Sequence, residues 1–316
     1  MAHRLAERTI AVLGFGNQGE AHALNLRDSG SEVVVGARPG GDAEARSRLL
    51  GFPTMDLVSA ASRAAVVAVL LPDEVLPSLW TELAAALAPG TALLFAHGYN
   101  LLYADLALPA RGDVVLVSPT APGRVLRALH ERGETLPGYL AVHVDATGSA
   151  WDLAAAYAAR LGCAPVWRTS VREETEVDLF GEQAVLCGGV NELLTAAFDT
   201  LVEAGYAPEM VYLECVHQLK YLADLLHERG IAGARRSISA TALFGDLTRG
   251  PRVVDGRTRE ELKRMLEEIR SGAFAREWAA EAASGGPRLR ERVERAARHP
   301  LEEARRRVLE ASEGDS

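Results

Sequence analysis

Two carboxylates in the second half of the chain stand at a spacing that suits a metal ion. Asp178 and Glu182, in "EETEVDLFGEQAVLCGG", are four residues apart and therefore share one face of a helix. Their neighbours on that face are largely apolar, and two like charges there cost free energy unless something neutralises them. Mg²⁺ binds one or two carboxylates together with waters and substrate oxygens. The alternative interpretation is a solvated acidic edge.

The next helical stretch, "YLECVHQLKYLADLL", repeats the pattern in a weaker form. Glu214 and Gln218 are four residues apart, again among apolar neighbours. A carboxylate and an amide on a facing helix could complete a metal site, although a neutral amide oxygen is a poorer Mg²⁺ ligand than a carboxylate. We assign His217, which lies between them, to packing or to the surface rather than to the metal.

A glycine-rich turn near the N-terminus predicts dinucleotide binding. The segment "VLGFGNQGEAHALNL" places three glycines at GxGxxG spacing between a strand and a helix. In such a turn the first glycine permits the bend, the second lets the backbone approach a pyrophosphate, and the third lets helix and strand pack closely. A purely structural turn is the alternative. The predicted contacts are Gly14, Phe15, Gly16, Asn17, Gln18 and Gly19.

The loop "GARPGGDAEARS" after the second predicted strand leaves the choice between NADPH and NADH open. Arg38 could stack on the adenine or meet a 2′-phosphate, or it could be a solvated loop residue. Gly41 and Ala43 offer no hydroxyl, and Asp42 would repel a phosphate. We predict that Arg38 and Asp42 lie at the adenosine end of the cofactor.

Further cofactor contacts are expected where other predicted strands end. His97, in "AHGYN", follows a predicted strand, and the ends of parallel strands border the ligand crevice in such sheets. We expect His97 to lie near the nicotinamide. Leu71 and Pro72 in "LLPDE", and Gly123 in "SPTAPGRVLR", complete the predicted cofactor contacts.

The pattern of apolar runs predicts an α/β domain followed by an all-helical one. Continuous apolarity favours parallel strands covered on both faces, and strand and helix alternating gives a doubly wound sheet. After about Ser170 the apolar residues recur at helical spacing over 172–205, 208–230 and 259–282. We predict a Rossmann domain over 1–170 and a helical domain over 171–316, with 285–316 as a solvated helix that frays at its end. The predicted strands are 8–15, 31–38, 64–72, 91–98, 113–119, 138–144 and 165–170.

Composition excludes several classes of protein. The chain has 316 residues, 48% hydrophobic and 24% charged, with a net charge of −9 and no dense basic run, so no nucleic-acid partner is expected. Cys163, Cys187 and Cys215 are far apart, which argues against a cysteine zinc site and for buried, reduced thiols. We expect no membrane partner and a cytoplasmic protein, because neither a leader nor an apolar run of about 20 residues is evident.

Several motifs, taken in order, strongly resemble those of the short-chain (class I) ketol-acid reductoisomerases. They are "GFGNQGEAHALNLRDSG", "LLPDE", "FAHGYN", "AVHVDATG", "EETEVDLFGEQAVLCGG", "LVEAGYAPE", "YLECVHQLK" and "TRGPRVV", from about Thr9 to about Pro300. The resemblance implies a Rossmann domain joined to a knotted helical domain. It also implies a two-step reaction of branched-chain amino acid synthesis. A Mg²⁺-dependent alkyl shift converts an acetohydroxy acid, and NADPH then reduces the 2-keto product.

The resemblance also assigns roles to individual residues. Asp178 would bridge two magnesium ions, and Glu182 would bind one of them. Glu214 would come from the partner subunit, as would Ser239, which would hold the substrate carboxylate. His97 would lie at the junction of cofactor and substrate. A homodimer or higher oligomer with shared active sites is therefore expected, acting on a small-molecule substrate.

The chain departs from the family pattern at places that bear on the chemistry. Thr120-Ala121-Pro122-Gly123-Arg124 stands where the family has Lys-Gly-Pro-Gly-His, and that lysine helps to hold the oxygen between the two metals. Gln218 replaces a metal-binding glutamate, and Ala240 replaces an Asp or Asn. Gly41 and Ala43 stand where the family has the hydroxyl residues that bind the 2′-phosphate of NADPH. One magnesium site is therefore expected rather than two.

Three hypotheses remain open at this point. The first is a reductase of a 2-keto acid or an imine that has lost the alkyl migration, in a specialised pathway, with His97, Thr120, Gln218 and Ser239 at its catalytic centre. The second is a working reductoisomerase in which water or Arg124 replaces the lysine. The third is a non-catalytic dinucleotide-binding homologue, against which the retained carboxylates argue.

Overall fold

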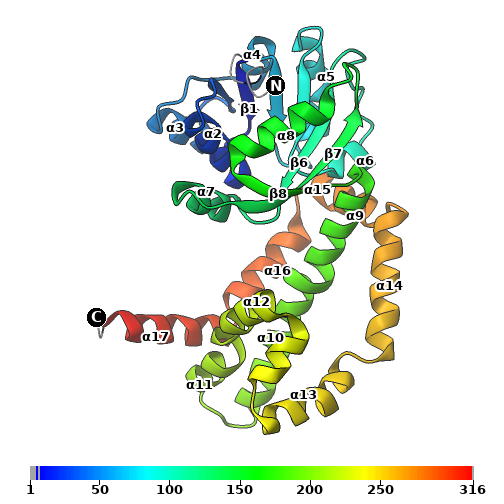
Figure 1. The fold of residues 1–316 in the computed structure, drawn as a ribbon. Helices are drawn as coiled ribbons and strands as arrows, with labels where there is room; N and C mark the ends of the chain where they lie inside the picture. The colour runs from blue at the N-terminus through cyan, green and yellow to red at the C-terminus, as the bar shows by residue number, and fades with distance from the viewer. Residues whose placement is uncertain (1–4, 6–7, 315–316) are drawn as a thin grey trace. The chain divides into compact units, whose positions relative to one another are not determined.

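The computed structural model describes residues 5 and 8–314, which form two compact units, Met1–Val177 and Asp178–Ser316 (Figure 1). The division falls inside helix α9 (Val171–Gly181), which begins at the predicted domain boundary. The first unit holds a sheet between helices, and the second is helical. This confirms an α/β Rossmann domain followed by a helical C-terminal domain.

One eight-stranded sheet forms the centre of the first unit, in the order β3-β2-β1-β4-β5-β6-β7-β8. Each apolar run predicted as a strand overlaps one, although β7 and β8 begin two residues before the predicted runs 138–144 and 165–170. β3 was not predicted, since two residues leave no periodic signal. The strands are β1 (Ile10–Leu13), β2 (Val33–Gly36), β3 (Thr54–Met55), β4 (Val66–Val69), β5 (Ala92–Phe95), β6 (Val114–Pro119), β7 (Leu136–Val144) and β8 (Cys163–Arg168).

The strands from β3 to β6 are parallel, but β7 pairs with β6 in the antiparallel sense. The prediction of a wholly parallel sheet was therefore wrong at this edge. Along β7, buried and exposed residues partly alternate, and most of β8 is exposed. One face of an antiparallel strand can meet solvent, whereas a central parallel strand is covered on both faces.

Helices cover both faces of this sheet, as Figure 1 shows. One core lies under α2 and α8, where Leu24, Leu26 and Tyr157 are buried. The opposite core lies under α4 and α5, around Trp80 and Leu83. The helices of this unit before α9 are α2 (Asn17–Asp28), α3 (Asp42–Leu49), α4 (Leu57–Arg63), α5 (Leu76–Ala86), α6 (Tyr99–Tyr103), α7 (Gly123–Glu131) and α8 (Ala150–Leu161).

Within the described residues no strand follows Arg168, as predicted. The long helical stretch 172–205 is interrupted by a π-helical turn, and so is the stretch 208–230. The elements after α9 are η1 (Glu182–Leu186), α10 (Gly188–Glu203), α11 (Pro208–Tyr212), η2 (Leu213–His217), α12 (Leu219–Ser237), α13 (Ala240–Val253), α14 (Gly256–Arg270), α15 (Ala273–Ala283), α16 (Pro287–Ala297) and α17 (Pro300–Gly314).

The C-terminal stretch differs from the solvated helix that was predicted. It forms two helices, and α17 packs on α11 through Ala304, which is fully buried beside Phe198 and Val211. Leu301 and Val308 flank that contact. Many of the Arg and Glu residues of this stretch lie on the outer face of α17. Its apolar stripe is narrow, so the composition alone predicted a solvated helix.

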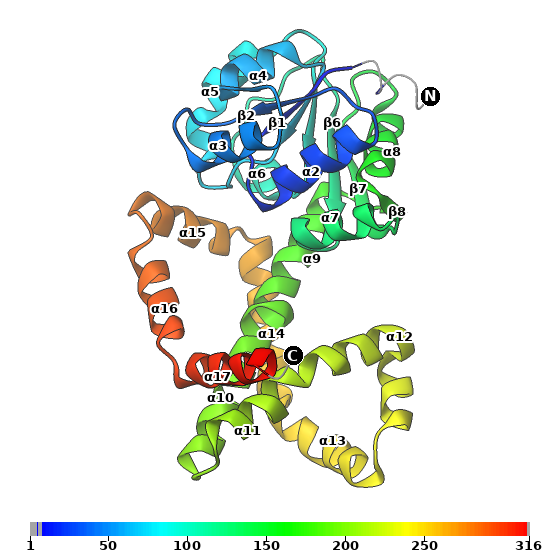
Figure 2. The ribbon, with the colours of Figure 1, turned by 90° about the vertical axis from the view of Figure 1, so that its left-hand side faces the viewer.

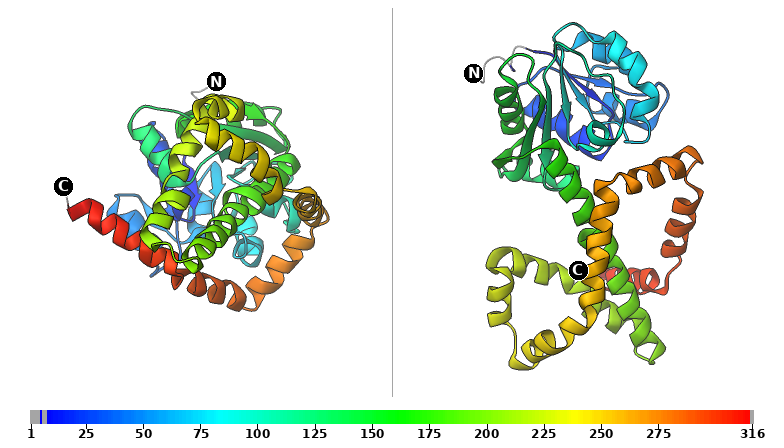
Figure 3. Two further views of the ribbon diagram at one scale, coloured as in Figure 1. Left: turned by 90° about the horizontal axis from the view of Figure 1, so that it is seen from below. Right: turned by 90° about the vertical axis from the view of Figure 1, so that its right-hand side faces the viewer.

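The helical unit leaves many large apolar side chains exposed. Figure 2 and the right-hand view of Figure 3 show α12, α13 and α14 running as an open loop, without the layered packing of the sheet unit. Leu186 is 71% exposed, and Phe244 is 65% exposed. By length and composition alone, the continuous helix Val171–Glu203 is apolar enough to cross a membrane, which is weak evidence for a span. Only 6% of its most apolar window is buried within this chain.

The three cysteines are free, but they do not share one environment. Cys163 is buried at the start of β8, and burial raises the pKa of its thiol to about 12. Cys187 is exposed and Cys215 is half-buried, so the expectation of three buried thiols was wrong for these two.

Candidate cofactor and active site

The turn between β1 and α2 has the geometry that a bound pyrophosphate requires. Gly14 has a φ of +93°, and a Cβ there would lie 2.5 Å from the Leu70 carbonyl oxygen. A Cβ on Gly19 would lie 2.1 Å from the Gly14 oxygen, so the helix packs so closely on the turn that only glycine fits at this position. Nothing lies within 4 Å of a Cβ built on Gly16, which leaves its backbone open to a ligand.

Helix α2 begins without a side-chain cap. Gly16 is its N-cap and makes no side-chain hydrogen bond to the first turn, so backbone N–H groups of this turn can bind an anion. The Phe15 side chain is buried and packs edge-on against Phe52, with ring centroids 5.7 Å apart. Phe15 therefore offers only its backbone to a cofactor.

A second segment docks on this turn. Gln18 Nε2 donates to the Ala121 oxygen at 3.1 Å, and the Arg124 backbone N–H donates to Asn17 Oδ1 at 3.3 Å. A Cβ on Gly123 would lie 1.9 Å from the Asn17 oxygen, which explains why a glycine stands at the start of α7. The segment 120–124 and the glycine turn thus form one surface.

The loop after β2 offers one cation and two carboxylates at the adenosine end. Arg38 is exposed, and Gly41 lies beneath its side chain, where a Cβ would be 3.7 Å from the Arg38 Nε. Asp42 is exposed at the first position of α3, and Glu44 Oε2 accepts from the Gly40 N–H at 2.7 Å. No hydroxyl stands between Pro39 and Ala45.

The carboxyl ends of four parallel strands bring the other predicted cofactor contacts to one edge of the sheet. The glycine turn follows β1, Leu71 and Pro72 follow β4, His97 follows β5, and Thr120 follows β6. Leu71 is half-buried and Pro72 is exposed.

Glu174 holds His97 in place, and sequence reasoning missed it. His97 Nδ1 donates to Glu174 Oε1 at 3.3 Å, and the Gly98 N–H donates to Glu174 Oε2 at 3.1 Å. The Glu174 side chain is 2% exposed, whereas that of His97 is 26% exposed. The signal in the sequence was the position of Glu174 one helical turn before Asp178 in "EETEVD".

Asp73 and Asn100 form a second polar pair at the same edge, also missed. Asn100 Nδ2 donates to Asp73 Oδ1 at 2.7 Å and to the Asp73 carbonyl oxygen at 3.3 Å. Burial raises the pKa of the Asp73 carboxyl, although His97 and the Asn100 hydrogen bond act in the opposite direction. The Asn100 Oδ1 atom is buried without a hydrogen-bond donor among the described residues.

Thr120 is exposed at the end of β6, where the family lysine would stand. Its Oγ1 donates to the Pro137 carbonyl oxygen at 2.8 Å, and its backbone N–H donates to the same oxygen at 3.1 Å. The side chain is therefore committed to β7. It supplies no positive charge.

The predicted metal ligands lie at or beside the two π-helical turns. Asp178 is on α9 and Glu182 opens η1, and both are exposed. Glu214 lies within η2 and is exposed. Single π-helical turns occur frequently at functional sites because they redirect side chains within a helix.

Gln218 is hydrogen-bonded to the predicted ligand Glu214. Gln218 Nε2 donates to Glu214 Oε2 at 2.6 Å. The amide thus occupies one oxygen of that carboxylate, at the place where the family has a second carboxylate. This contact could not be read from the spacing of the two residues alone.

Carboxylate oxygens are the ligands that Mg²⁺ prefers, so the donor set fits this ion in kind. Within the part of the chain that the structure describes, no three His, Cys, Asp or Glu side chains gather into a metal-binding group. Ser239 caps the N-terminus of α13, where its Oγ accepts from the Ala242 N–H at 3.2 Å, and it is exposed. Within one chain, Asp178 and Glu182 thus do not gather with Glu214 into such a group.

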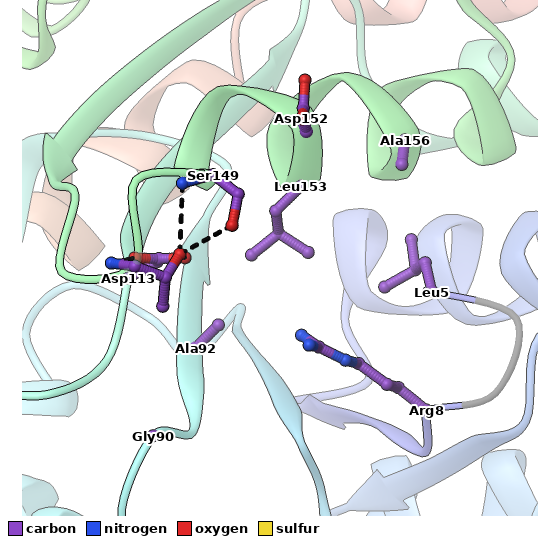
Figure 4. A pocket seen from close by; sticks show the side chains of 10 residues that line it. Leu5, Arg8, Gly90, Ala92, Asp113, Ser149, Asp152, Leu153 and Ala156 are labelled. Atoms are coloured by element: carbon purple, nitrogen blue, oxygen red, sulfur yellow. Dashed lines mark hydrogen bonds between the residues drawn. The ribbon is translucent and has the colours of Figure 1, made fainter. Parts of the chain in front are cut away.

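A separate hollow of about 560 Å³ lies at the other edge of the sheet (Figure 4). It is lined by Arg8, Ala92, Asp113, Ser149 and Leu153, among others. The Asp113 carboxylate accepts from the Thr147 hydroxyl at 2.7 Å and from the Thr147 N–H at 3.0 Å. None of the predicted site residues lines this hollow.

Two family models together match nearly the whole chain. "Acetohydroxy acid isomeroreductase, NADPH-binding domain" matches residues 4–166, and "Ketol-acid reductoisomerase, C-terminal domain" matches residues 171–313. Among solved structures, the chain is similar to an NADH-preferring ketol-acid reductoisomerase from an uncultured archean. The identity is 36% and the TM-score 0.94, covering 98% of this chain and 96% of that one.

More distant structures share the fold alone. A semialdehyde dehydrogenase NAD-binding protein from Cupriavidus necator is 19% identical, with a TM-score of 0.65, over 84% of this chain and 99% of that chain. A 1-pyrroline-5-carboxylate reductase from Streptococcus pyogenes is 11% identical, with a TM-score of 0.58, over 84% and 98%. Together with the two family models, the glycine turn and the paired carboxylates, the 36% identity establishes that this chain belongs to the ketol-acid reductoisomerases, a family of NAD(P)H-dependent oxidoreductases.

Proposed function

We propose that this protein reduces a 2-keto acid or an imine with a nicotinamide cofactor and no longer catalyses the alkyl migration of its family. The hydrogen bond from Gln218 to Glu214, at 2.6 Å, carries the proposal. Gln218 stands where the family has a second carboxylate, and its amide is hydrogen-bonded to the first carboxylate, Glu214. Because branched-chain amino acid synthesis needs the alkyl migration, its loss favours a role in a specialised pathway instead.

The alkyl shift demands more of the site than the reduction does. It needs two close Lewis acids, one for the ketone oxygen and one for the neighbouring alkoxide. Gln218 removes a ligand charge from one of these positions. Thr120 removes the cation that would hold the oxygen between them, and its hydroxyl is bonded to Pro137 instead. Both substitutions weaken the same step.

Hydride transfer needs only a polarised double bond beside the nicotinamide. A bound NAD(P)H would supply the hydride to the carbonyl carbon of a 2-keto acid, and the π electrons of that C=O bond would pass to its oxygen. That oxygen takes one proton, giving a 2-hydroxy acid and NAD(P)⁺. His97 is the proposed proton donor, and Glu174 is the positioning residue that accepts from its Nδ1.

Magnesium fits this proposal as one ion rather than two. Asp178 and Glu182 on one chain, with Glu214 from a partner, would hold it. A bound Mg²⁺ would supply polarisation of the substrate carbonyl. Ser239 of the same partner would meet the substrate carboxylate.

A homodimer with shared active sites follows from the same separation of ligands. The exposed apolar side chains of the helical unit, such as Leu186 and Phe244, support a large apolar interface. The apolar helix Val171–Glu203, nearly uncovered within one chain, supports it as well.

NADH rather than NADPH is the cofactor that the adenosine loop favours. Asp42 and Glu44 flank a loop without hydroxyls, and Arg38 is the one feature there that opposes the choice. The related reductoisomerase at 36% identity is described as NADH-preferring. Its similarity over 98% of this chain also keeps a working reductoisomerase as the second candidate.

The test supplies two substrates with Mg²⁺ and either nicotinamide. 2-Acetolactate requires both steps, whereas the rearranged 3-hydroxy-2-ketoisovalerate requires only reduction. The proposal expects NAD(P)H oxidation with the second, or with another 2-keto or imino acid, and at least a hundredfold less with the first. Turnover of 2-acetolactate at an ordinary enzyme rate would establish the second candidate instead.

A further inference from the structure

Most arginines around the glycine turn are already neutralised. Arg46 pairs with Glu20 in the first turn of α2, and Arg48 pairs with Glu44. Arg127 pairs with Asp28 at 2.6 Å and with Glu131 at 3.0 Å. These guanidinium groups are therefore committed within the protein.

Arg124 is different. It is exposed, and its guanidinium makes no ion pair and no hydrogen bond to any residue that the structure describes. Its backbone is nevertheless fixed, because the Arg124 N–H donates to Asn17 Oδ1 at 3.3 Å. The side chain therefore starts from a defined point beside the turn.

Two helix N-termini meet at that point. Helix α2 starts at Asn17, and α7 starts at Gly123, where a Cβ would lie 1.9 Å from the Asn17 oxygen. Neither helix has a side-chain cap. Helix N-termini attract anions, and the open backbone at Gly16 leaves room for one.

We propose that Arg124 binds the pyrophosphate of the nicotinamide cofactor and does not replace the missing lysine at the metal site. A guanidinium fork matches phosphate oxygens with two parallel N–H···O bonds, whereas it is a poor substitute for the point charge of an ammonium group. Arg38, another exposed arginine at this edge, follows β2 at the adenosine end. The two arginines would then bind different parts of one dinucleotide.

This assignment rests on the dinucleotide site of the family and not on the proposed loss of the alkyl migration. The two can fail separately. Cofactor affinity can be measured without metal or substrate, whereas the migration is measured by turnover of 2-acetolactate.

The experiment measures dissociation constants for NADH and ADP-ribose by titration calorimetry of the full chain in EDTA. Arg124→Ala should weaken both about ten- to hundredfold, the range of one or two charge-assisted hydrogen bonds. Arg124→Lys should recover part of the loss. Adenosine, which lacks the pyrophosphate, should bind both proteins equally.

Arg111→Ala is the matched control. Arg111 is also exposed, but it precedes β6 and so lies at the opposite edge of the sheet. Its removal changes the net charge equally and should leave the dissociation constants unchanged. If Arg124→Ala binds NADH and ADP-ribose within twofold of the unmodified protein, the assignment to the pyrophosphate is wrong. The charge would then be available to the metal site.

Discussion

The Nδ1 atom of His97 lies 3.3 Å from Oε1 of Glu174, and this contact ties the carboxyl end of β5 to the first turns of α9. The second Glu174 oxygen accepts from the Gly98 N–H, so the carboxylate fixes both the ring and the backbone that carries it. Removing its charge would loosen the imidazole without disturbing the cofactor turn, which lies after a different strand.

Glu174→Gln should slow the reduction and spare cofactor binding. We expect kcat for the reducible substrate to fall about ten- to hundredfold, at or below the low end of what general acid–base catalysis contributes, because Glu174 acts through His97. The dissociation constant of NADH should stay within about twofold, and the pH profile of kcat should shift. Glu82→Gln, an exposed carboxylate on α5, is the control and should change none of these quantities. An unshifted pH profile with full kcat would remove Glu174 from the site.

The buried His22 should make the sheet unit sensitive to acid. His22 is fully buried against Tyr157, with its Nδ1 3.0 Å from the tyrosine Oη, and burial lowers the pKa of His22 to about 3. The unfolded chain takes up a proton near pH 6.5 and the folded chain does not. This contribution to stability is therefore present above pH 6.5 and is lost as the pH falls towards 3.

Between pH 7.5 and 5.5, His22 alone should lower the free energy of unfolding by about 1.4 kcal/mol. Urea unfolding of the double variant His22→Leu with Tyr157→Phe, which leaves no unpaired hydroxyl, should lose that part of the pH dependence. Equal pH dependence in both proteins would mean that His22 does not stay neutral in the folded chain.

The sequence predicted β1, β2, β4, β5 and β6 well because each is a continuous apolar run whose residues are all buried. Local pattern sufficed there. Local pattern did not predict that β7 is antiparallel to β6. The direction in which an edge strand pairs depends on the rest of the sheet and not on the residues of that strand alone. Local pattern also missed α17, where only Leu301, Ala304 and Val308 face the core.

For the site, spacing identified the glycine turn and the candidate carboxylates, and these remain predictions as cofactor and metal contacts. It could not find Glu174, because the partners of that carboxylate, His97 and Gly98, stand 76 or more residues away. The π-helical turns beside Glu182 and Glu214 were equally invisible, since an extra residue in a helical turn leaves the apolar spacing nearly unchanged.

Adding hydroxyls to the adenosine loop should move the cofactor preference towards NADPH. Gly41 has an ordinary negative φ, and a Cβ there would lie 3.3 Å from the Arg38 oxygen, so a serine fits after a small shift. The double variant Gly41→Ser with Ala43→Ser should tighten NADPH binding about tenfold, near 1.4 kcal/mol, and leave NADH within about threefold. An unmodified protein that already binds NADPH a hundredfold more tightly would contradict the proposed preference.

Light scattering should give a mass at least twice the 33.8 kDa of one chain. Exposed apolar side chains of the helical unit are the proposed interface, so Leu193→Asp on α10, which is 52% exposed, should weaken the dimer. Leu49→Asp, which is 83% exposed on α3 of the sheet unit, is the control. A monomer at micromolar concentration would rule out shared active sites.

The double variant Thr120→Lys with Gln218→Glu should restore part of the alkyl shift. Loss of one charged group that organises a transition state commonly costs about a hundredfold to a thousandfold in rate. Two losses around one metal-bound oxygen need not add, so neither single variant should recover the full effect. The measurement is turnover of 2-acetolactate in Mg²⁺, which should rise at least tenfold in the double variant.

The number of magnesium ions bound per chain is an independent measure of the effect of this double variant. The Gln218 amide now donates to Glu214 at 2.6 Å, and a carboxylate in its place would repel Glu214 unless a cation lay between them. Calorimetry should therefore find one Mg²⁺ per chain in the unmodified protein and two in the double variant. Asn191→Asp, the same amide-to-carboxylate change at an exposed position of α10 outside the predicted ligands, is the matched control and should leave one. Two ions already bound by the unmodified protein would show that Gln218 does not weaken the second position, and the proposed loss of migration would then lack its cause.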